Sequence, residues 1–493
     1  MPADTHVLAE APPASARNAS IVNLGCKVNQ AEMEAAARLF RARGVRLVRP
    51  SDPADVVLVN TCTVTGVADE KSRAAVRRAR RASPDAEILV TGCSVQVAPE
   101  MFAAVDPTAR LLPNDAKGGL VAELERLVGL DDRDARTAEP LPTLTGAEPV
   151  TAVAVEGADD ERASIERTRA FVKVQDGCSF YCTYCIIPRA RGAERSLPPD
   201  AILADVRRAL AEGHREIVLT GINVGTYDGG WSERGFRGSH VRSALTLAGL
   251  IRRLLAETDI ERIRLSSIEP QHVDDALLDT WRASDGRCLP HFHLPLQSAD
   301  DGVLRRMGRR YTSAEYAATV GRIRTAVRGA AVHADVIVGF PTEDETAFEA
   351  TVDFVRELEF DGLHVFRYSQ RPGTAATRMA GHVDERVKKR RAARLLELGA
   401  AARARRVTTR RGGRAFVLLE TPLPDGRWLG HAEDDMLVAV MPRPDDPPSL
   451  ENALADVTVV DADPAVLGRA VGRIDDLRLA SRRLPRRLAM VGA

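Results

Sequence analysis

Six of the seven cysteines in this chain fall into two groups of three, and no other feature of the sequence points so directly to chemistry. The compact group is Cys178, Cys182 and Cys185, and the dispersed group, whose members each follow an apolar run, is Cys26, Cys62 and Cys93. A 4Fe–4S cluster that only transfers electrons normally takes four cysteine ligands. Three thiolates would leave one iron open, so we predict two 4Fe–4S clusters that carry out chemistry at iron.

Other uses of cysteine are less consistent with this pattern. A disulfide framework is disfavoured because the number of cysteines is odd, the chain is long and no secretory segment precedes them. A zinc site with His291 or His293 as fourth ligand stays open, although structural zinc usually uses paired C-x2-C or C/H modules and none is present. The seventh cysteine, Cys288, is expected to be a buried thiol that packs as a small hydrophobe.

The compact group has the spacing C-x3-C-x2-C, with the aromatic Tyr184 directly before its last cysteine. This pattern resembles the signature of radical S-adenosylmethionine (SAM) enzymes. The resemblance implies that the open iron is chelated by the amino and carboxylate groups of SAM. One electron from the cluster would then cleave SAM to methionine and a 5′-deoxyadenosyl radical, so the difficult chemistry belongs to the cofactor.

The dispersed cysteines must be brought together by the elements around them. Apolar runs at 21–24, 56–59 and 88–90 alternate with helical patterns at 32–43 and 71–81, which predicts a parallel α/β sheet. A cysteine follows each run, and ligands of open α/β sheets gather at the carboxyl ends of the strands. We therefore expect the three thiols to converge, with three separate buried thiols as the alternative.

Length and composition limit the number of domains and the classes of partner. At 493 residues, the chain should hold about three domains. Lys+Arg and Asp+Glu both number 69, so net charge indicates no class of partner. No stretch is apolar enough to span a membrane, and the Ala/Pro-rich start lacks the core of a signal peptide, so we expect a cytoplasmic protein with no membrane contact. The expected divisions are a disordered N-terminus (1–18), an α/β domain (19–130), a linker (131–168), a second α/β domain (169–400), a small β-barrel (401–475) and a basic tail (476–493).

The second α/β domain contains six strand-like runs, at 171–174, 216–219, 263–265, 292–294, 332–338 and 362–366. Six βα units predict a partial (β/α)6 barrel with its site at the carboxyl ends of the strands. The Arg- and Lys-rich segment 383–414 predicts a helix whose charges either face solvent or contact phosphates. Short strand patterns beyond it predict a small β-barrel of the kind that often binds oligonucleotides.

Two cysteine triads, an open α/β domain, a partial barrel and a C-terminal β-barrel together resemble the radical SAM methylthiotransferases. The loop at 176–192 matches the cluster loop of that family, and the C-terminal piece looks like its RNA-binding TRAM domain. Gly25-Cys26-Lys27-Val28-Asn29-Gln30 resembles the MtaB branch, which methylthiolates threonylcarbamoyladenosine just 3′ of the anticodon. Branches that act on isopentenyladenosine or on a ribosomal protein aspartate usually have Gln-Met or Pro-Lys after this cysteine.

The resemblance also implies which residues contact the cofactors. The residues implied at SAM are Tyr184, Gly221, Asn223, Ser266, Glu269, Gln297, Gly339 and Glu343. Gly221 and Asn223 occupy the place of the SAM amino group, while the segment at Gly339 would pair with the adenine. Tight βα turns and loop capping are the ordinary alternatives for these residues. The resemblance implies that the Cys26, Cys62 and Cys93 cluster accepts a methyl group onto a sulfur species at its open iron, and that this sulfur with its methyl is delivered to carbon 2 of the base.

The implied partners are the tRNA anticodon loop, a low-potential electron donor and a sulfur donor. RNA recognition favours loops, and an adenosine in the anticodon loop is already partly free. Two alternatives remain from the sequence: a methylthiotransferase for isopentenyladenosine or a ribosomal protein aspartate, and an iron–sulfur RNA-binding protein without catalysis. The SAM-like segments at 219–224 and 336–343 weigh against the second, because a pure redox protein needs neither.

Overall fold

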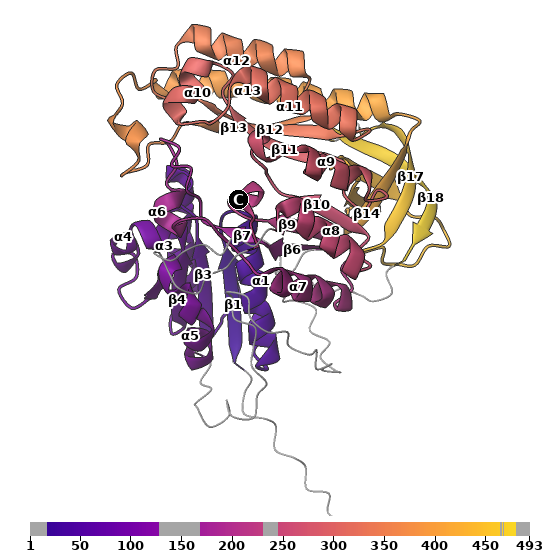
Figure 1. Cartoon of the computed structure of the whole chain (residues 1–493). Helices are drawn as coiled ribbons and strands as arrows, with labels where there is room; N and C mark the ends of the chain where they lie inside the picture. Colours follow the sequence, from indigo (N-terminus) through magenta and orange to yellow (C-terminus); the bar gives the residue numbers. More distant parts are fainter. Residues whose placement is uncertain (1–16, 128–167, 230–244, 464–465, 467, 480–493) are drawn as a thin grey trace, which may run out of the picture.

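The computed structural model of this chain describes residues 17–127, 168–229, 245–463, 466 and 468–479, which form three units (Figure 1). The expected disordered N-terminus (1–18), linker (131–168) and basic tail (476–493) lie wholly or largely outside the described residues. Among the described residues, no helix combines the length and apolar character that crossing a membrane would need.

The N-terminal unit is one parallel sheet with the strand order β2-β1-β3-β4-β5. Its strands are β1 (Asn18–Asn23), β2 (Arg46–Val48), β3 (Val56–Thr61), β4 (Glu87–Gly92) and β5 (Arg110–Leu112). Its helices are α1 (Lys27–Ala42), α2 (Gly66–Ala82), α3 (Cys93–Val97), α4 (Pro99–Ala103) and α5 (Leu120–Leu127), after the short 3-10 turn η1 (Asn114–Gly119). The predicted strands and helices are confirmed, and β2 and β5 were missed because they are too short to show a pattern.

Both faces of this sheet are covered. Phe40 of α1 and Leu124 of α5 pack with Leu58 of β3 on one face. Val76 of α2 and Phe102 of α4 form the core of the other. A parallel sheet buried on both sides needs apolar residues at successive positions, which is why β3 and β4 appear in the sequence as continuous apolar runs.

The central unit is the predicted partial barrel. Its six strands are β6 (Arg169–Lys173), β9 (Glu216–Thr220), β10 (Arg262–Leu265), β11 (His291–Gln297), β12 (Ala331–Val338) and β13 (Gly362–Arg367). They form two parallel three-stranded sheets, β10-β9-β6 and β11-β12-β13. Parallel bridges between Ile263 and Cys288 and between Ser267 and His293 join the two sheets. Cys288 is buried in the core, as predicted.

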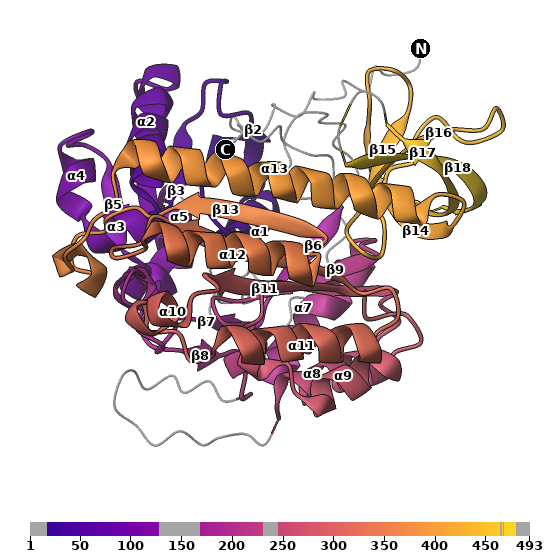
Figure 2. The ribbon, with the colours of Figure 1, turned by 90° about the horizontal axis from the view of Figure 1, so that it is seen from above.

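Helices cover the outside of the barrel (Figure 2). They are α7 (Pro199–Ala211), α8 (Leu247–Glu257), α9 (Asp275–Arg282), α10 (Asp301–Met307), α11 (Ser313–Ala326), α12 (Glu345–Leu358) and α13 (Glu385–Arg410). Smaller elements are β7 (Gln175–Asp176), α6 (Ile187–Arg191), β8 (Arg195–Ser196), η2 (Val224–Thr226), η3 (Pro270–His272) and η4 (Ala375–Arg378). Phe292 and Leu294 of β11 pack into the helix-covered core, so the alternate side chains His291 and His293 face the barrel interior.

The C-terminal unit is a closed five-stranded barrel, as predicted, with the order β14-β15-β16-β18-β17. Its strands are β14 (Arg414–Pro422), β15 (Trp428–His431), β16 (Leu437–Met441), β17 (Leu454–Ala462) and β18 (Arg469–Arg478). It seals the amino end of the central barrel: buried Arg262 donates to the carbonyl of Phe416 at 2.7 Å, and buried Arg264 to that of Ala432 at 3.1 Å.

The basic helix α13 runs along the central barrel and reaches the C-terminal barrel (Figure 2). Arg391 bonds Glu343 of the central unit at 2.7 Å, and Arg406 bonds Asp434 of the C-terminal unit at 2.6 Å. Arg391 and Arg406 therefore hold α13 to the central and C-terminal units, and these two charges are not available to bind RNA phosphates. The expected boundary between residues 400 and 401 falls inside this helix, and the β-barrel itself starts at Arg414.

Candidate active site between the two α/β units

The dispersed cysteines all lie at the carboxyl edge of the N-terminal sheet. Cys26 caps α1 just after β1, Cys62 directly follows β3, and Cys93 opens α3 directly after β4. Burial raises the pKa of Cys62 to about 12, and the neighbouring Cys93 and Cys26 thiols contribute to this shift. The three side chains are thus close enough to act on one another, so the structure brings together residues that are far apart in sequence.

Two glycines let these loops approach each other. Gly25 has φ +115°, and a Cβ atom there would lie 2.7 Å from Nδ2 of Asn29 and 3.2 Å from Cβ of Cys62. Gly92 has φ +105°, and a Cβ atom there would lie 2.5 Å from the backbone N and O of Thr61. L-residues rarely adopt this backbone conformation. The Gly-Cys pairs at 25–26 and 92–93 are therefore required by the crowding around the cysteines.

The compact cysteines lie in the loop between β7 and α6. The backbone N–H of Cys178 donates to Gly192 at 3.1 Å, and that of Cys185 donates to Cys182 at 2.9 Å, so the loop folds back on itself. Burial raises the pKa of Cys185 to about 12, and Cys182 and Cys178 act on it in the same direction. All three cysteines are partly exposed, so the loop is open to a ligand.

The spacing of the sulfur atoms argues against a single zinc ion. Two cysteine sulfurs on one tetrahedral zinc lie about 3.8 Å apart, given Zn–S bonds near 2.3 Å. Within the part of the chain that the structure describes, neither cysteine triad has its three sulfurs within 4.8 Å of one another. His291 and His293 belong to separate groups that contain no cysteine, so the alternative with a histidine as fourth zinc ligand has no geometric support.

Three of the residues implied at SAM carry buried polar atoms with no hydrogen-bond partner. These atoms are Oδ1 and Nδ2 of Asn223, Oγ of Ser266 and Oε1 of Gln297. A buried polar group without a partner is costly, so such groups normally indicate an unseen ligand or water. Gly221 packs against Gln175, whose Oε1 accepts the backbone N–H of Asn223 at 2.8 Å. The interior near these strand ends is thus suited to a polar ligand.

Tyr184 and Glu269 meet at Arg309, which sequence reasoning missed. Arg309 forms an ion pair with Glu269 and donates to the Tyr184 hydroxyl at 3.4 Å and to Sγ of Cys182 at 3.5 Å. Burial raises the pKa of Glu269, although Arg309 opposes this shift. Arg309 lies between α10 and α11, where no local motif marks it, so only the tertiary contact reveals it.

Gly339 and Glu343 lie together after β12. The Glu343 carboxylate accepts the backbone N–H of Gly339 at 2.8 Å and bonds Arg391 of α13 at 2.7 Å. The side chain of Glu343 therefore holds its own loop and fastens that loop to α13. The role of both residues in binding adenine stays a prediction, and it would fall to backbone groups of the segment.

A buried ion network that the sequence did not reveal joins the two cysteine loops. Arg191, which ends α6 after the compact triad, donates to Glu32 and Asp176 at 3.0 Å each and to Asn29 at 2.5 Å. Asn29 in turn contacts the Cys26 sulfur at 3.9 Å. Burial opposes the charge of Arg191, but Glu32 and Asp176 hold its pKa well above the usual range.

Three further cations complete this network. Lys117 bonds Glu32 at 2.6 Å, Lys173 bonds Glu32 at 3.0 Å and Asp176 at 2.8 Å, and Arg195 bonds Asp176 at 3.0 Å. Burial works against the two carboxylates, but these cations hold the pKa of both well below the usual range. The network therefore stays ionised at neutral pH, and its cations outnumber its carboxylates beside Cys26 and Cys93.

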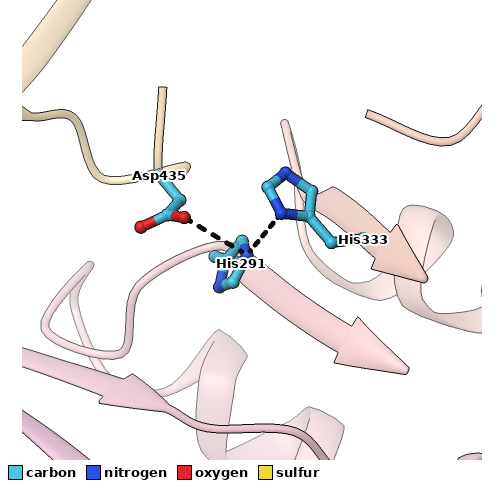
Figure 3. Close-up of side chains that lie close together, drawn as sticks. All are labelled: His291, His333 and Asp435. Carbon is cyan, nitrogen blue, oxygen red and sulfur yellow. Dashed lines mark hydrogen bonds and ion pairs between the residues drawn. The ribbon is translucent and has the colours of Figure 1, made fainter. Parts of the chain in front are cut away.

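A separate cluster of histidines and an aspartate lies in the interior of the central barrel. Nε2 of His291 lies 3.3 Å from Nδ1 of His333 and 3.8 Å from Oδ2 of Asp435, a residue of the β15–β16 turn (Figure 3). Burial holds the pKa of His291 well below its usual range and lowers that of His333 to about 4. Arg264 also bonds Asp435 at 3.2 Å, so this cluster already contains a cation.

Two family models match the chain. Residues 18–112 match the "Uncharacterized protein family UPF0004", and residues 172–355 match the "Radical SAM superfamily". The fold, the compact triad and these matches define a radical SAM enzyme with an added N-terminal α/β domain. A radical SAM enzyme implies a 4Fe–4S cluster and SAM.

Relatives with curated names show which kind of radical SAM enzyme this is. The "Threonylcarbamoyladenosine tRNA methylthiotransferase MtaB" of Bacillus subtilis is 38% identical over 76% of this chain and 78% of its own length. The "tRNA-2-methylthio-N(6)-dimethylallyladenosine synthase" of Maricaulis maris is 34% identical over 77% of this chain and 81% of its own. Proteins with the MtaB name from other bacteria are 32% to 34% identical. The chain belongs to the radical SAM methylthiotransferases of the MtaB type.

Among solved structures, the radical S-adenosylmethionine methyltransferase TsrM from Kitasatospora setae has a TM-score of 0.49 and 15% identity over 71% of this chain and 73% of its own. A likeness this distant carries no argument about function. The family resemblance inferred from the sequence is confirmed by the named relatives, and the ligand role of each cysteine stays a prediction.

Proposed function

We propose that this protein adds a methylthio group to carbon 2 of threonylcarbamoyladenosine in tRNA, at the nucleoside just 3′ of the anticodon. The observation that carries this function is the match to MtaB proteins over most of both chains. The enzyme would work in the cytoplasm, where a low-potential electron donor and a sulfur donor would also reach it. The cysteines of each triad lie close enough to act on one another, and Arg191 joins the two cysteine loops, which supports the same conclusion.

Within this function, two 4Fe–4S clusters would have separate ligands. The first would be held by Cys178, Cys182 and Cys185, and the second by Cys26, Cys62 and Cys93. The sulfur spacing is too wide for a single tetrahedral zinc ion, whereas a cluster binds each sulfur to a different iron. When bound, the first cluster with SAM would supply the radical that activates carbon 2, and the second would supply the sulfur that is transferred.

The chain's own residues would orient SAM beside the first cluster. Asn223, Ser266 and Gln297 offer the unpartnered polar atoms that its ribose hydroxyls and its methionyl amino and carboxylate groups need. Arg309 holds Tyr184 and Glu269 in place beside Cys182. We assign these roles to three domains: the N-terminal α/β domain (19–130), the radical SAM domain (169–400) and the β-barrel (401–475). Helix α13 spans the boundary between the last two.

The test uses the anaerobically reconstituted full-length enzyme with reductant, SAM, a sulfide source and anticodon stem-loop RNA. One RNA carries threonylcarbamoyladenosine and a matched RNA carries isopentenyladenosine at the same position. Mass spectrometry of the digested nucleosides should show a methylthio product from the first RNA and little or none from the second. Methylthio product from the isopentenyladenosine RNA alone would show that the enzyme belongs to the branch that acts on isopentenyladenosine. Zinc without iron in the purified protein would contradict a radical SAM enzyme altogether.

A further inference from the structure

Lys27 is the first residue of α1 and directly follows Cys26. The charged groups whose electrostatic influence reaches it come from other units: Asp435 of the β15–β16 turn, Arg169 of β6, Arg264 of β10 and Asp335 of β12. The side chain is open to solvent, although these groups surround it. Lys27 therefore belongs to the N-terminal domain but points into the interior of the central barrel, beside a predicted cluster ligand.

Three other cations around this interior have carboxylate partners. Arg309 pairs with Glu269, while Arg264 bonds Glu216 at 2.7 Å and Arg169 bonds Glu420 at 3.0 Å. Lys27 makes no hydrogen bond or ion pair with any other residue in the described part of the chain.

The two aspartates near Lys27 are occupied by other groups. Asp435 is bonded by Arg264, and Asp335 accepts from His293 at 2.7 Å and from His364 at 3.1 Å. Within the described residues, the ammonium group of Lys27 thus has no carboxylate partner.

The start of α1 adds to this positive potential. Cys26 at the N-cap forms no side-chain cap hydrogen bond, and the first turn contains no acidic residue. The free N–H groups and the dipole of a 16-residue helix favour an anion at this end. An ammonium group and an uncapped helix terminus therefore face the same space.

We propose that Lys27 binds the carboxylate of the threonyl group on the substrate nucleoside and so selects this nucleoside over uncharged ones. The inference rests on the proposed function. The threonylcarbamoyl group brings the only carboxylate of this nucleoside. It is attached to the exocyclic nitrogen on carbon 6, and carbon 6 and carbon 2 both adjoin ring nitrogen 1. The carboxylate therefore extends from the same edge of the base as the reacting carbon, where a residue next to Cys26 can reach it.

The experiment measures binding of the reconstituted full-length enzyme to three anticodon stem-loops that differ at one nucleoside. One carries threonylcarbamoyladenosine, the second carries its methyl ester, which lacks the negative charge, and the third carries unmodified adenosine. The variants are Lys27→Gln, Lys27→Arg and, as a control, Lys71→Gln, which removes an exposed lysine from α2 of the same domain. Product formation by the wild-type enzyme on the first RNA is measured in parallel.

A hydrogen-bonded ion pair of this kind is worth about 10- to 100-fold in affinity. Lys27→Gln should lose this factor for the acid-bearing RNA, and its affinities for the ester and the unmodified RNA should stay unchanged. Lys27→Arg should retain most of the preference, and Lys71→Gln should match the wild type.

Equal loss on all three RNAs, or no loss on any, overturns the role of Lys27, because a backbone phosphate contact or a structural role would behave in that way. Absence of methylthio product from the wild-type enzyme would instead overturn the proposed function. If that product forms but Lys27→Gln still distinguishes acid from ester as the wild type does, the proposed function survives and the inference about Lys27 falls.

Discussion

Replacing Arg191 with Met should test whether the buried network holds the two cysteine loops together. Breaking a buried ion pair typically costs about 3–5 kcal/mol when it leaves a carboxylate unpaired. Lys117 and Lys173 would still compensate Glu32, and Lys173 and Arg195 would still compensate Asp176. We therefore expect the lower end, a loss of about 3 kcal/mol in the free energy of unfolding.

Arg195→Met is the matched control, because Arg195 pairs with Asp176 in the same network but its side chain is 37% exposed. Solvent screening should limit its cost to about 1 kcal/mol or less. Urea unfolding of the apoprotein, followed by circular dichroism, measures both values. Iron content after reconstitution should also fall in Arg191→Met, because Asn29 would lose its contact with Arg191 beside Cys26. Equal losses in the two variants would refute the reasoning.

Three further predictions use the same protein. The folded-state pKa values of Glu32 and Asp176 are depressed, so the stability they contribute is complete above about pH 5 and declines as pH falls below their unfolded values near 4; the free energy of unfolding of the wild type should therefore fall between about pH 5 and pH 3, and an unchanged value over that range would contradict this sign. Replacing Cys178, Cys182 and Cys185 with Ala should remove about half of the iron and abolish SAM cleavage, measured as deoxyadenosine, because each triad would hold one 4Fe–4S cluster. Replacing Cys26, Cys62 and Cys93 with Ala should preserve deoxyadenosine formation while abolishing the methylthio nucleoside; product from this variant would show that the N-terminal triad does not present the sulfur.

The sequence predicted those parts of the fold that depend on periodicity and chain order. Strand–helix alternation is local, so all six barrel strands and the strands before Cys26, Cys62 and Cys93 were found. The convergence of the dispersed cysteines also followed, because parallel strands place their carboxyl ends at one edge. Short elements such as β2 and β5, with three residues each, carry too little pattern to be recognised.

The contacts between units could not be predicted in this way. Arg191 and Glu32 are 159 residues apart, and Arg371 and Asp69 are 302 apart, so nothing in either local sequence marks the pairing. The basic helix α13 shows the same limitation. Its composition left a solvated face and a phosphate-binding face open, whereas Arg391 and Arg406 in fact join neighbouring units. Charge density in a sequence does not reveal which charges already have partners.

Two buried arginines of the central unit explain how the two cysteine groups can cooperate. Arg191 directly follows the compact triad and reaches Asn29, which contacts Cys26. Arg371, after β13, bonds Thr63 at 2.6 Å and also pairs with Asp69, which accepts from Ser94 at 2.7 Å.

Thr63 and Ser94 are the residues next to Cys62 and Cys93. Every loop of the N-terminal triad is therefore positioned by the domain that carries the other triad. Under the proposed function, a radical generated at one triad would have to meet sulfur presented at the other, and buried ion pairs at both ends of the interface would fix the distance between them.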